Sequence, residues 1–357
     1  MSRGFSTRKG SPYIMIKEIH EQPSIAGSIV NRDSEPYAKA SEYIINSRRI
    51  FIVGSGSSYH AGLVLGLSLR RIGYNVYEVV SSEYDHIIDL VDEKSTVVAL
   101  SQSGSTSDTL EAVKAMKSRG AVIISVTNVE KSPLALLSDH TLYVGAGREE
   151  AVTATKSFTG QVINLVRIYI EILRNTGREF FELEHDLRDL PKILREHIYR
   201  SEVSIRNFID FLYRKDHMYI GGREYQFIAS LESSLKIKET CGIHAEALHM
   251  GEIRHGPKSI IDENFVIGFL LRDNRDLELS KRIIDEISDS NAIMLINAPE
   301  EIETPASDRI FVVRRRSVSR ELSLILDVAT YQLLSYYIAV ARLLDPDYPR
   351  RLSKVVI

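Results

Sequence analysis

Three charged residues, Glu232, Lys236 and Glu239, have the spacing of a single helix face, because residues three and four positions apart lie on successive turns. A carboxylate in such a cluster is suited to general acid–base chemistry. With an ordinary pKa of about 4.3, a glutamate needs surroundings that raise its basicity. The alternative is a solvated helix with a simple Glu–Lys pair. The Gly-Gly turn before the helix and the Gly- and His-rich segment after it favour an inward-facing cluster.

The segment that follows, residues 244–257, is rich in titratable groups. It contains three histidines and two glutamates, a composition that metal sites also have. No pair shows the His-Glu-x-x-His spacing of a zinc protease, so we rank acid–base chemistry above metal binding and expect no metal ion. We predict a loop rich in groups that can exchange protons near neutral pH, where histidine titrates.

Two segments rich in glycine and hydroxyl groups, 54–62 and 101–109, each follow a predicted strand and begin a predicted helix. Backbone N–H groups at a helix N-terminus bind phosphate, and hydroxyl groups add donors. Neither segment contains Lys or Arg, which suits a small phosphorylated metabolite that must be released. Plain helix caps are the alternative. Tyr59 stands where a dinucleotide fingerprint has its third glycine, and there is no Walker-type lysine, so both of those nucleotide sites are disfavoured.

Short β-branched runs alternate with amphipathic stretches, as in a doubly wound α/β fold. The predicted strands of the first half cover residues 49–53, 75–79, 95–100, 121–126 and 142–144. Those of the second half cover residues 218–220, 266–271, 292–296 and 309–313. The predicted helices cover residues 108–119, 226–240, 277–288 and 320–343, with a charged helical connection over 179–214. The repeated order of elements indicates an internal duplication.

Composition narrows the class of protein. The 357 residues predict two domains, and 45 basic against 48 acidic residues leave a net charge of −3, which disfavours general nucleic-acid binding. We expect no membrane segment. The single cysteine, Cys241, excludes an internal disulfide and fits a reducing, cytoplasmic setting. Residues 1–14 resemble a loose tail rather than a secretory signal.

The two hydroxyl-rich segments resemble the phosphosugar-binding loops of the sugar isomerase (SIS) domain family. More narrowly, the chain is similar to the isomerase half of glucosamine-6-phosphate synthases at residues 15–23, 56–62, 101–110 and 150–159, and the similarity continues to the C-terminus. It implies two tandem SIS units, each a doubly wound five-stranded parallel sheet flanked by helices. The implied divisions are a tail and helix (1–40), a first SIS domain (41–195), a second SIS domain (196–345) and a C-terminal active-site tail (346–357).

The resemblance also implies roles for single residues. Glu239 would move a proton between C1 and C2 of the sugar, His255 would open the sugar ring, often from the neighbouring subunit, and Lys354 would form a Schiff base with the ketose. Glu232 and Lys236 would line the site. The implied phosphate-binding residues are Ser57, Ser58, Ser101, Gln102, Ser103 and Thr106, and the implied substrate-binding residues are Val152 and Thr153. A homodimer with composite active sites and no cofactor is expected.

The sequence contains no glutaminase domain of the kind that begins the full synthase. We therefore expect a glucosamine-6-phosphate deaminase, similar to stand-alone SIS-type deaminases. The alternatives are a phosphosugar isomerase, an isomerase subunit supplied with ammonia by a separate glutaminase, and a fructosamine-phosphate deglycase. Ser105 replaces the Glu of the synthase pattern Ser-Gln-Ser-Gly-Glu-Thr, which leaves the substrate open. A non-catalytic sugar-phosphate sensor is disfavoured because Glu239, His255 and Lys354 are all present.

Overall fold

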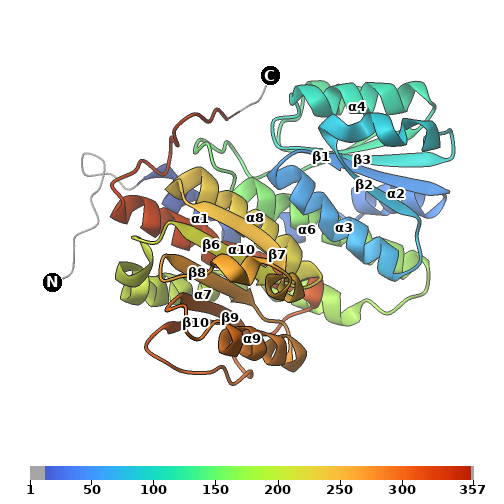
Figure 1. The fold of residues 1–357 in the computed structure, drawn as a ribbon. Helices are drawn as coiled ribbons and strands as arrows, with labels where there is room; N and C mark the ends of the chain where they lie inside the picture. The colour runs from blue at the N-terminus through green and yellow to red at the C-terminus, as the bar shows by residue number, and fades with distance from the viewer. Residues whose placement is uncertain (1–12, 355–357) are drawn as a thin grey trace. The chain divides into compact units, whose positions relative to one another are not determined.

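The computed structural model describes residues 13–354, so most of the tail predicted over residues 1–14 lies outside the described residues. The chain divides into two compact units, each with one sheet (Figure 1). The first unit holds β1–β5 and takes residues 22–149, 156–191 and 353–354. The second unit holds β6–β10 and takes residues 13–21, 150–155 and 192–352. Each unit is therefore built from more than one stretch of the chain.

The sheet of the first unit is entirely parallel, with strand order β2-β1-β3-β4-β5. Its strands are β1 (Arg49–Gly54), β2 (Val76–Val80), β3 (Ser95–Ser101), β4 (Val122–Thr127) and β5 (His140–Tyr143). The central strand β3 is buried along its whole length, as expected for a parallel strand that helices cover on both faces. All five strands predicted from the sequence are present, within one or two residues at each end.

Helices cover both faces of this sheet. The 3-10 helix η1 (Ser81–Leu90), α4 (Ser107–Ser118) and α5 (Pro133–Leu137) pack on one face over a buried core that includes Phe51, Val97 and Ile123. The other helices of this unit are α2 (Glu35–Ile45), α3 (Ser57–Arg71) and α6 (Lys156–Asn175), of which α6 contacts both α2 and α3. Helix α6 is buried from Lys156 to Leu173, which makes it a core element rather than a surface helix.

The sheet of the second unit is also entirely parallel, with strand order β10-β9-β8-β6-β7. Its strands are β6 (His217–Gly222), β7 (His244–His249), β8 (Phe265–Leu270), β9 (Ile293–Pro299) and β10 (Ile310–Arg315). When the strands of each sheet are numbered along the chain, both sheets have the same order, second-first-third-fourth-fifth. The duplication inferred from element order therefore extends to strand topology.

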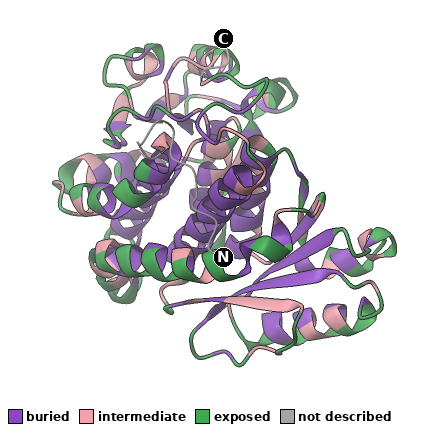
Figure 2. Cartoon of the chain, turned by 90° about the vertical axis from the view of Figure 1, so that its left-hand side faces the viewer, coloured by how far each residue is buried: buried purple, intermediate pink, exposed green. Residues whose placement is uncertain are grey.

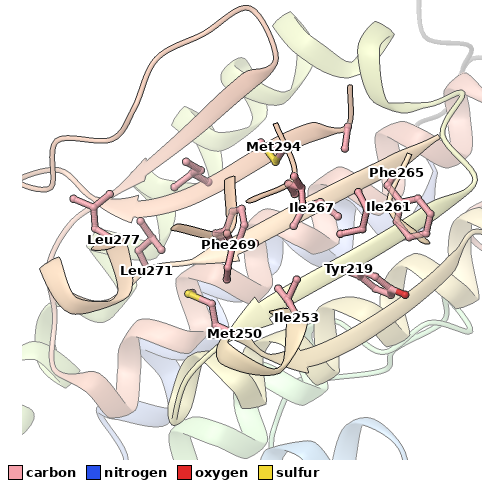
Figure 3. Close-up of a cluster of buried hydrophobic side chains, with 14 of the residues drawn as sticks. Tyr219, Met250, Ile253, Ile261, Phe265, Ile267, Phe269, Leu271, Leu277 and Met294 are labelled. Atoms are coloured by element: carbon pink, nitrogen blue, oxygen red, sulfur yellow. The ribbon is translucent and has the colours of Figure 1, made fainter. Parts of the chain in front are cut away.

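The helices of this unit are α7 (Phe181–Leu212), which begins in the first unit, α8 (Tyr225–Cys241), α9 (Asn274–Glu286) and α10 (Arg320–Ala341), with the 3-10 helices η2 (Met250–Arg254) and η3 (Pro257–Ile260). Helix α1 (Ile14–Val30) begins the described chain. Side chains from one face of the sheet pack against η2 and α9 (Figure 3). Alternation along β8 turns Gly268 to the opposite face, where the hydroxyl of Tyr331 on α10 occupies the space that a Cβ would need.

One element was wrongly assigned from the sequence. Residues 244–257 were expected to form a single loop, but 244–249 form the edge strand β7, paired in parallel with β6. Its sequence, His-Ala-Glu-Ala-Leu-His, hides the strand because an edge strand with exposed positions needs no apolar run. The inner strand β8, by contrast, is buried along its whole length, and Figure 2 shows buried residues in purple along several strands.

Helix α10 is long and apolar enough to cross a membrane by length and composition. However, 94% of its most apolar 18-residue window is buried inside the structure. A buried core helix meets the same criteria, so this helix is weak evidence for membrane insertion.

Candidate active site

The first hydroxyl-rich loop connects β1 to α3 in two residues. A Cβ on Gly54 would lie 2.9 Å from the backbone nitrogen of Tyr59, so only glycine lets the helix start so close to the strand. Gly56 adopts φ 54° and ψ −130°, a conformation that favours glycine. In the first turn of α3, Ser58 is buried and its Oγ accepts a hydrogen bond from Gln161 Nε2 on α6 at 3.0 Å. Ser57 is half-buried at the first position of the helix.

The second loop connects β3 to α4 and is held by its own hydroxyl groups. Ser101 Oγ accepts a hydrogen bond from Gly104 N at 3.0 Å and lies 3.0 Å from Thr106 Oγ1. Ser103 Oγ accepts one from Ser105 N at 3.2 Å. Gly104 has φ 62°, and a Cβ there would lie 2.1 Å from Ser132 Oγ. The loop is therefore a fixed turn, with Gln102, Ser103 and Thr106 half-buried along it.

Both loops leave the same edge of the sheet. Strands β1 and β3 are parallel neighbours. The chain runs from β1 to β2 on one side of β1 and then to β3 on the other side, so the strand order reverses between β1 and β3. Ligands of open parallel sheets bind outside this point, at the carboxyl ends of the strands. The structure thus brings together the six residues expected to bind phosphate, and that role remains a prediction.

Helix α8 carries the charged cluster in the second unit. Lys236 Nζ lies 3.1 Å from Glu232 Oε1 and 2.8 Å from Glu239 Oε2. The side chains of Lys236 and Glu232 are fully buried, whereas that of Glu239 is 21% exposed. A solvated Glu–Lys pair is therefore excluded, and Glu239 is the member of the cluster that solvent reaches.

The electrostatics of this cluster depend on the two carboxylates. Burial alone would lower the pKa of Lys236, but the attraction of Glu232 and Glu239 and their hydrogen bonds outweigh it and hold that pKa above its usual range. Lys236 is therefore a permanent cation at physiological pH. It holds one oxygen of the Glu239 carboxylate, whose side chain is 21% exposed.

Thr153 lies beside this helix. Its Oγ1 is 3.4 Å from Thr240 Oγ1, and both residues are buried, so the segment expected to bind substrate contacts the residue next to Glu239. The backbone N–H of Val152 donates to Asp347 O at 3.0 Å. The carboxylate of Asp347 in turn accepts hydrogen bonds from the backbone of Ile14 and Met15. The segment around Asp347 is thus docked in the second unit.

His255 does not reach the cluster on α8. It follows η2 as an exposed residue, and its backbone N–H donates to Glu252 O at 3.0 Å. Within residues 13–354, no hydrogen bond or ion pair joins its ring to Glu232, Lys236 or Glu239. Nor do three or more His, Cys, Asp or Glu residues form a potential metal site in this part of the chain.

Lys354 is paired with a residue that the sequence did not single out. Its Nζ lies 2.8 Å from Glu149 Oε2, within the first unit. The Glu149 carboxylate is fully buried and also accepts hydrogen bonds from the backbone N–H and the hydroxyl of Ser157. The only sign of Glu149 in the sequence is that it is an acidic residue directly before the 150–159 motif.

The carboxyl edge of the second sheet holds a charge network that was also missed. Arg223, after β6, pairs with Asp276 at 2.7 Å, and Arg272, after β8, pairs with Glu224. Glu224 directly precedes α8 and has φ 53° and ψ −119°, nearly the angles of Gly56 before α3. Burial raises the pKa of Asp276, although Arg272 opposes this shift. In place of hydroxyl groups, this edge carries guanidinium and carboxylate groups that neutralise one another.

Comparison with known proteins agrees with the fold and the motifs. Residues 43–170 match the SIS domain. Glutamine–fructose-6-phosphate aminotransferases (isomerizing) from Pyrobaculum aerophilum and Aeropyrum pernix are 35% and 37% identical over 99% and 98% of this chain. The chain spans only 59% and 58% of their lengths.

Two solved structures match over nearly their whole length. The C-terminal domain of the aminotransferase from Francisella tularensis is 25% identical, with a TM-score of 0.82, over 96% of this chain and 100% of that domain. Glucosamine-6-phosphate deaminase from Thermotoga maritima is also 25% identical, with a TM-score of 0.75, over 96% and 99%. This chain is therefore similar, along almost its whole length, to one part of these aminotransferases.

Proposed function

We propose that this chain, whose residues 43–170 are a SIS domain, is a phosphosugar aldose–ketose enzyme, and that its reaction is the deamination of glucosamine 6-phosphate to fructose 6-phosphate and ammonia. The observation that carries the class of reaction is the buried Glu232–Lys236–Glu239 cluster with one solvent-accessible carboxylate. The deaminase from Thermotoga maritima, whose structure is similar to 96% of this chain, supports the choice of reaction.

The sugar phosphate would be held through its phosphate at the β1 and β3 loops. The hydroxyls of Ser57, Ser101 and Thr106 and the first N–H groups of α3 and α4 supply donors without fixed positive charge. Such a site binds a dianion through hydrogen bonds that are readily exchanged for water. The two buried hydroxyls, Ser58 and Ser101, already bond within the protein and would shape the site as well as contact the ligand.

Glu239 would act as the base on the open-chain amino sugar. It removes the proton at C2, and the electron pair forms a C1–C2 double bond while the C1 carbonyl oxygen is protonated. The same carboxyl group returns the proton at C1, and the electrons move to give an imine at C2. Water then adds to this imine, and ammonia leaves to give the ketose. One group serves both transfers because C1 and C2 are neighbouring atoms on one face of the substrate.

Further residues would support this step. Lys236 keeps Glu239 oriented and stays protonated, and Glu232 balances its charge in the buried site. His255 would give and take the proton that opens the sugar ring, and its exposed position suits a contribution to the site of the partner subunit in a homodimer. Lys354 would form an imine with the ketose. Val152 and Thr153 would contact the sugar.

A second candidate is the isomerase reaction of an aminotransferase, with ammonia delivered from elsewhere. The identity of 35% to 37% with aminotransferases along nearly the whole chain favours it. The two reactions share the C1–C2 proton transfer and differ in the fate of nitrogen.

The deciding experiment is incubation of the full chain with glucosamine 6-phosphate in the absence of glutamine. We expect ammonia and fructose 6-phosphate in equal amounts. Formation of glucosamine 6-phosphate from fructose 6-phosphate and added ammonia, with no ammonia released from the amino sugar alone, would instead establish the isomerase reaction. No turnover of either sugar would contradict both.

A further inference from the structure

We infer that Glu149 is a positioning residue that holds Lys354 for attack on the ketose carbonyl, an inference that rests on the function proposed above. The pair connects residues 205 positions apart, with Nζ 2.8 Å from Oε2. Nothing in the local sequence predicts this contact.

Glu149 is fixed independently of Lys354. Ser157 donates to it twice, from its backbone N–H at 3.1 Å and from its hydroxyl at 2.7 Å. Ser157 is the second residue of the 20-residue helix α6, whose N-terminus carries partial positive charge that favours a carboxylate. Because the Glu149 side chain is fully buried, it has one well-defined position.

Lys354 is the member of the pair that solvent reaches. A lysine carries a point charge on a flexible four-carbon stem, so its nitrogen is poorly located unless a partner holds it. The side chain is 25% exposed, so the nitrogen is anchored by a buried group and still open to a ligand. The pair between Lys117 and Asp139 differs, because both of its side chains are 40% exposed. Exposed pairs of that kind give little positional control.

The chemistry needs both features. For imine formation the ammonium of Lys354 first loses one proton, which the adjacent carboxylate accepts. The free electron pair on Nζ then forms a bond to the carbonyl carbon of the ketose. The carbonyl oxygen takes up two protons, one from Glu149 and one from the nitrogen, and leaves as water with its bonding electrons. The resulting C=N nitrogen keeps one proton and the positive charge of the original ammonium, so the ion pair with Glu149 persists.

The test is to trap this imine with borohydride in the full chain, using fructose 6-phosphate, and to measure the mass increase on the peptide that contains Lys354. Because one charge-assisted hydrogen bond is lost, we expect Glu149→Gln to trap about 10- to 100-fold more slowly than the native chain. Glu149→Asp, which keeps the charge, should recover part of the rate. The matched control is Asp139→Asn, which breaks the exposed pair with Lys117 and should trap at the native rate.

Trapping at the native rate in Glu149→Gln, or no adduct on Lys354 in the native chain, would overturn the inference. If Glu149→Gln does not fold, Ser157→Ala replaces it, because that change removes one donor that fixes the carboxylate, and it should slow trapping less. Ammonia release from glucosamine 6-phosphate is measured in parallel. Deamination without an adduct refutes the role of Glu149 and keeps the proposed function, whereas an adduct without deamination does the reverse.

Discussion

At the carboxyl edge of the first sheet, the loops after β1 and β3 carry hydroxyl groups and glycines; at the same edge of the second sheet, the loops after β6 and β8 carry Arg223, Glu224 and Arg272 in ion pairs. The strand order is the same in both. Even the backbone of the residue before the helix repeats, with Gly56 and Glu224 at nearly the same φ and ψ.

The two sheets therefore share a strand order, but the loops at their carboxyl edges differ in chemistry. In the first unit the loops carry few charges, and their hydroxyl and N–H donors would bind a dianion from outside the chain. In the second unit the loops and α9 supply carboxylates, so the guanidinium groups are neutralised within the chain. The second unit contributes instead through α8, which starts at this charged edge and carries the Glu239 cluster. The proposed function therefore assigns phosphate binding to the first unit and proton transfer to the second.

The largest expected effect is on the proton transfer assigned to the second unit. Glu239→Gln should lower the rate of deamination by about 10²- to 10⁴-fold, the usual contribution of a general base, while substrate still binds. Uptake of solvent deuterium into the sugar measures the step directly. The control is Glu278→Gln on α9, which alters an exposed pair with Lys281. Deuterium uptake at the native rate in Glu239→Gln would remove this residue from the mechanism.

The second-largest expected effect is a difference between the two units in how far acid lowers their stability. Burial lowers the pKa of His197 to about 4, although its Nε2 lies 2.8 Å from Leu326 O. Between pH 6.5 and pH 4 the unfolded state therefore binds more protons, and the free energy of unfolding should fall as pH falls. The total loss over this range should be about 3 kcal/mol, from the pKa difference of His197.

The measurement is hydrogen exchange at several pH values, compared between α7 and α10 and the strands of the first unit. His197→Gln should flatten the pH dependence in α7 and α10. His185→Gln, on the same helix but with a 72% exposed side chain, should not. Equal acid sensitivity in the native chain and in His197→Gln would show that other groups control this loss.

A smaller effect tests the phosphate site. Ser103→Ala should raise the KM for the sugar phosphate about tenfold or more, because a hydrogen bond to a charged group contributes roughly 1.5–3 kcal/mol. Ser118→Ala, at the far end of α4, is the matched control. Arg223→Met, at the edge of the second sheet, should reduce stability and leave KM unchanged. A larger KM change in Arg223→Met than in Ser103→Ala would reverse the assignment of the two edges.

The smallest expected effect concerns the backbone conformation that Gly56 and Glu224 have in common. Gly56→Ala should destabilise the chain by about 1–3 kcal/mol, because its conformation is strained for any residue with a Cβ. Glu224→Gly relieves the same strain, but glycine adds about 0.5–1 kcal/mol of entropic cost and the pair with Arg272 is lost. The net change should stay within about 1 kcal/mol. Denaturant unfolding of both variants measures this, and equal losses would mean that the two turns are not equivalent.

Much of the fold and part of the site could be predicted from local patterns. Apolar runs such as 95–100 predicted buried parallel strands, and the spacing of Glu232, Lys236 and Glu239 predicted one helix face. The edge strand β7 was missed because its exposed positions are polar. The network of Arg223, Arg272 and Asp276 was missed because its members are charged residues in separate loops, which local patterns treat as surface.

The periodicities of the chain can be read from its sequence, as can the glycines at the tight turns and the residue types available for chemistry. These follow from interactions between residues a few positions apart, which any stretch of chain displays on its own. Which charged side chains are buried is known only from the tertiary structure, because burial depends on strands and helices that are distant in the sequence. Strand order and helix packing pair Lys354 with Glu149 and bring Thr153 into contact with Thr240. They also form the ion pairs at the carboxyl edge of the second sheet. No local pattern contains this information.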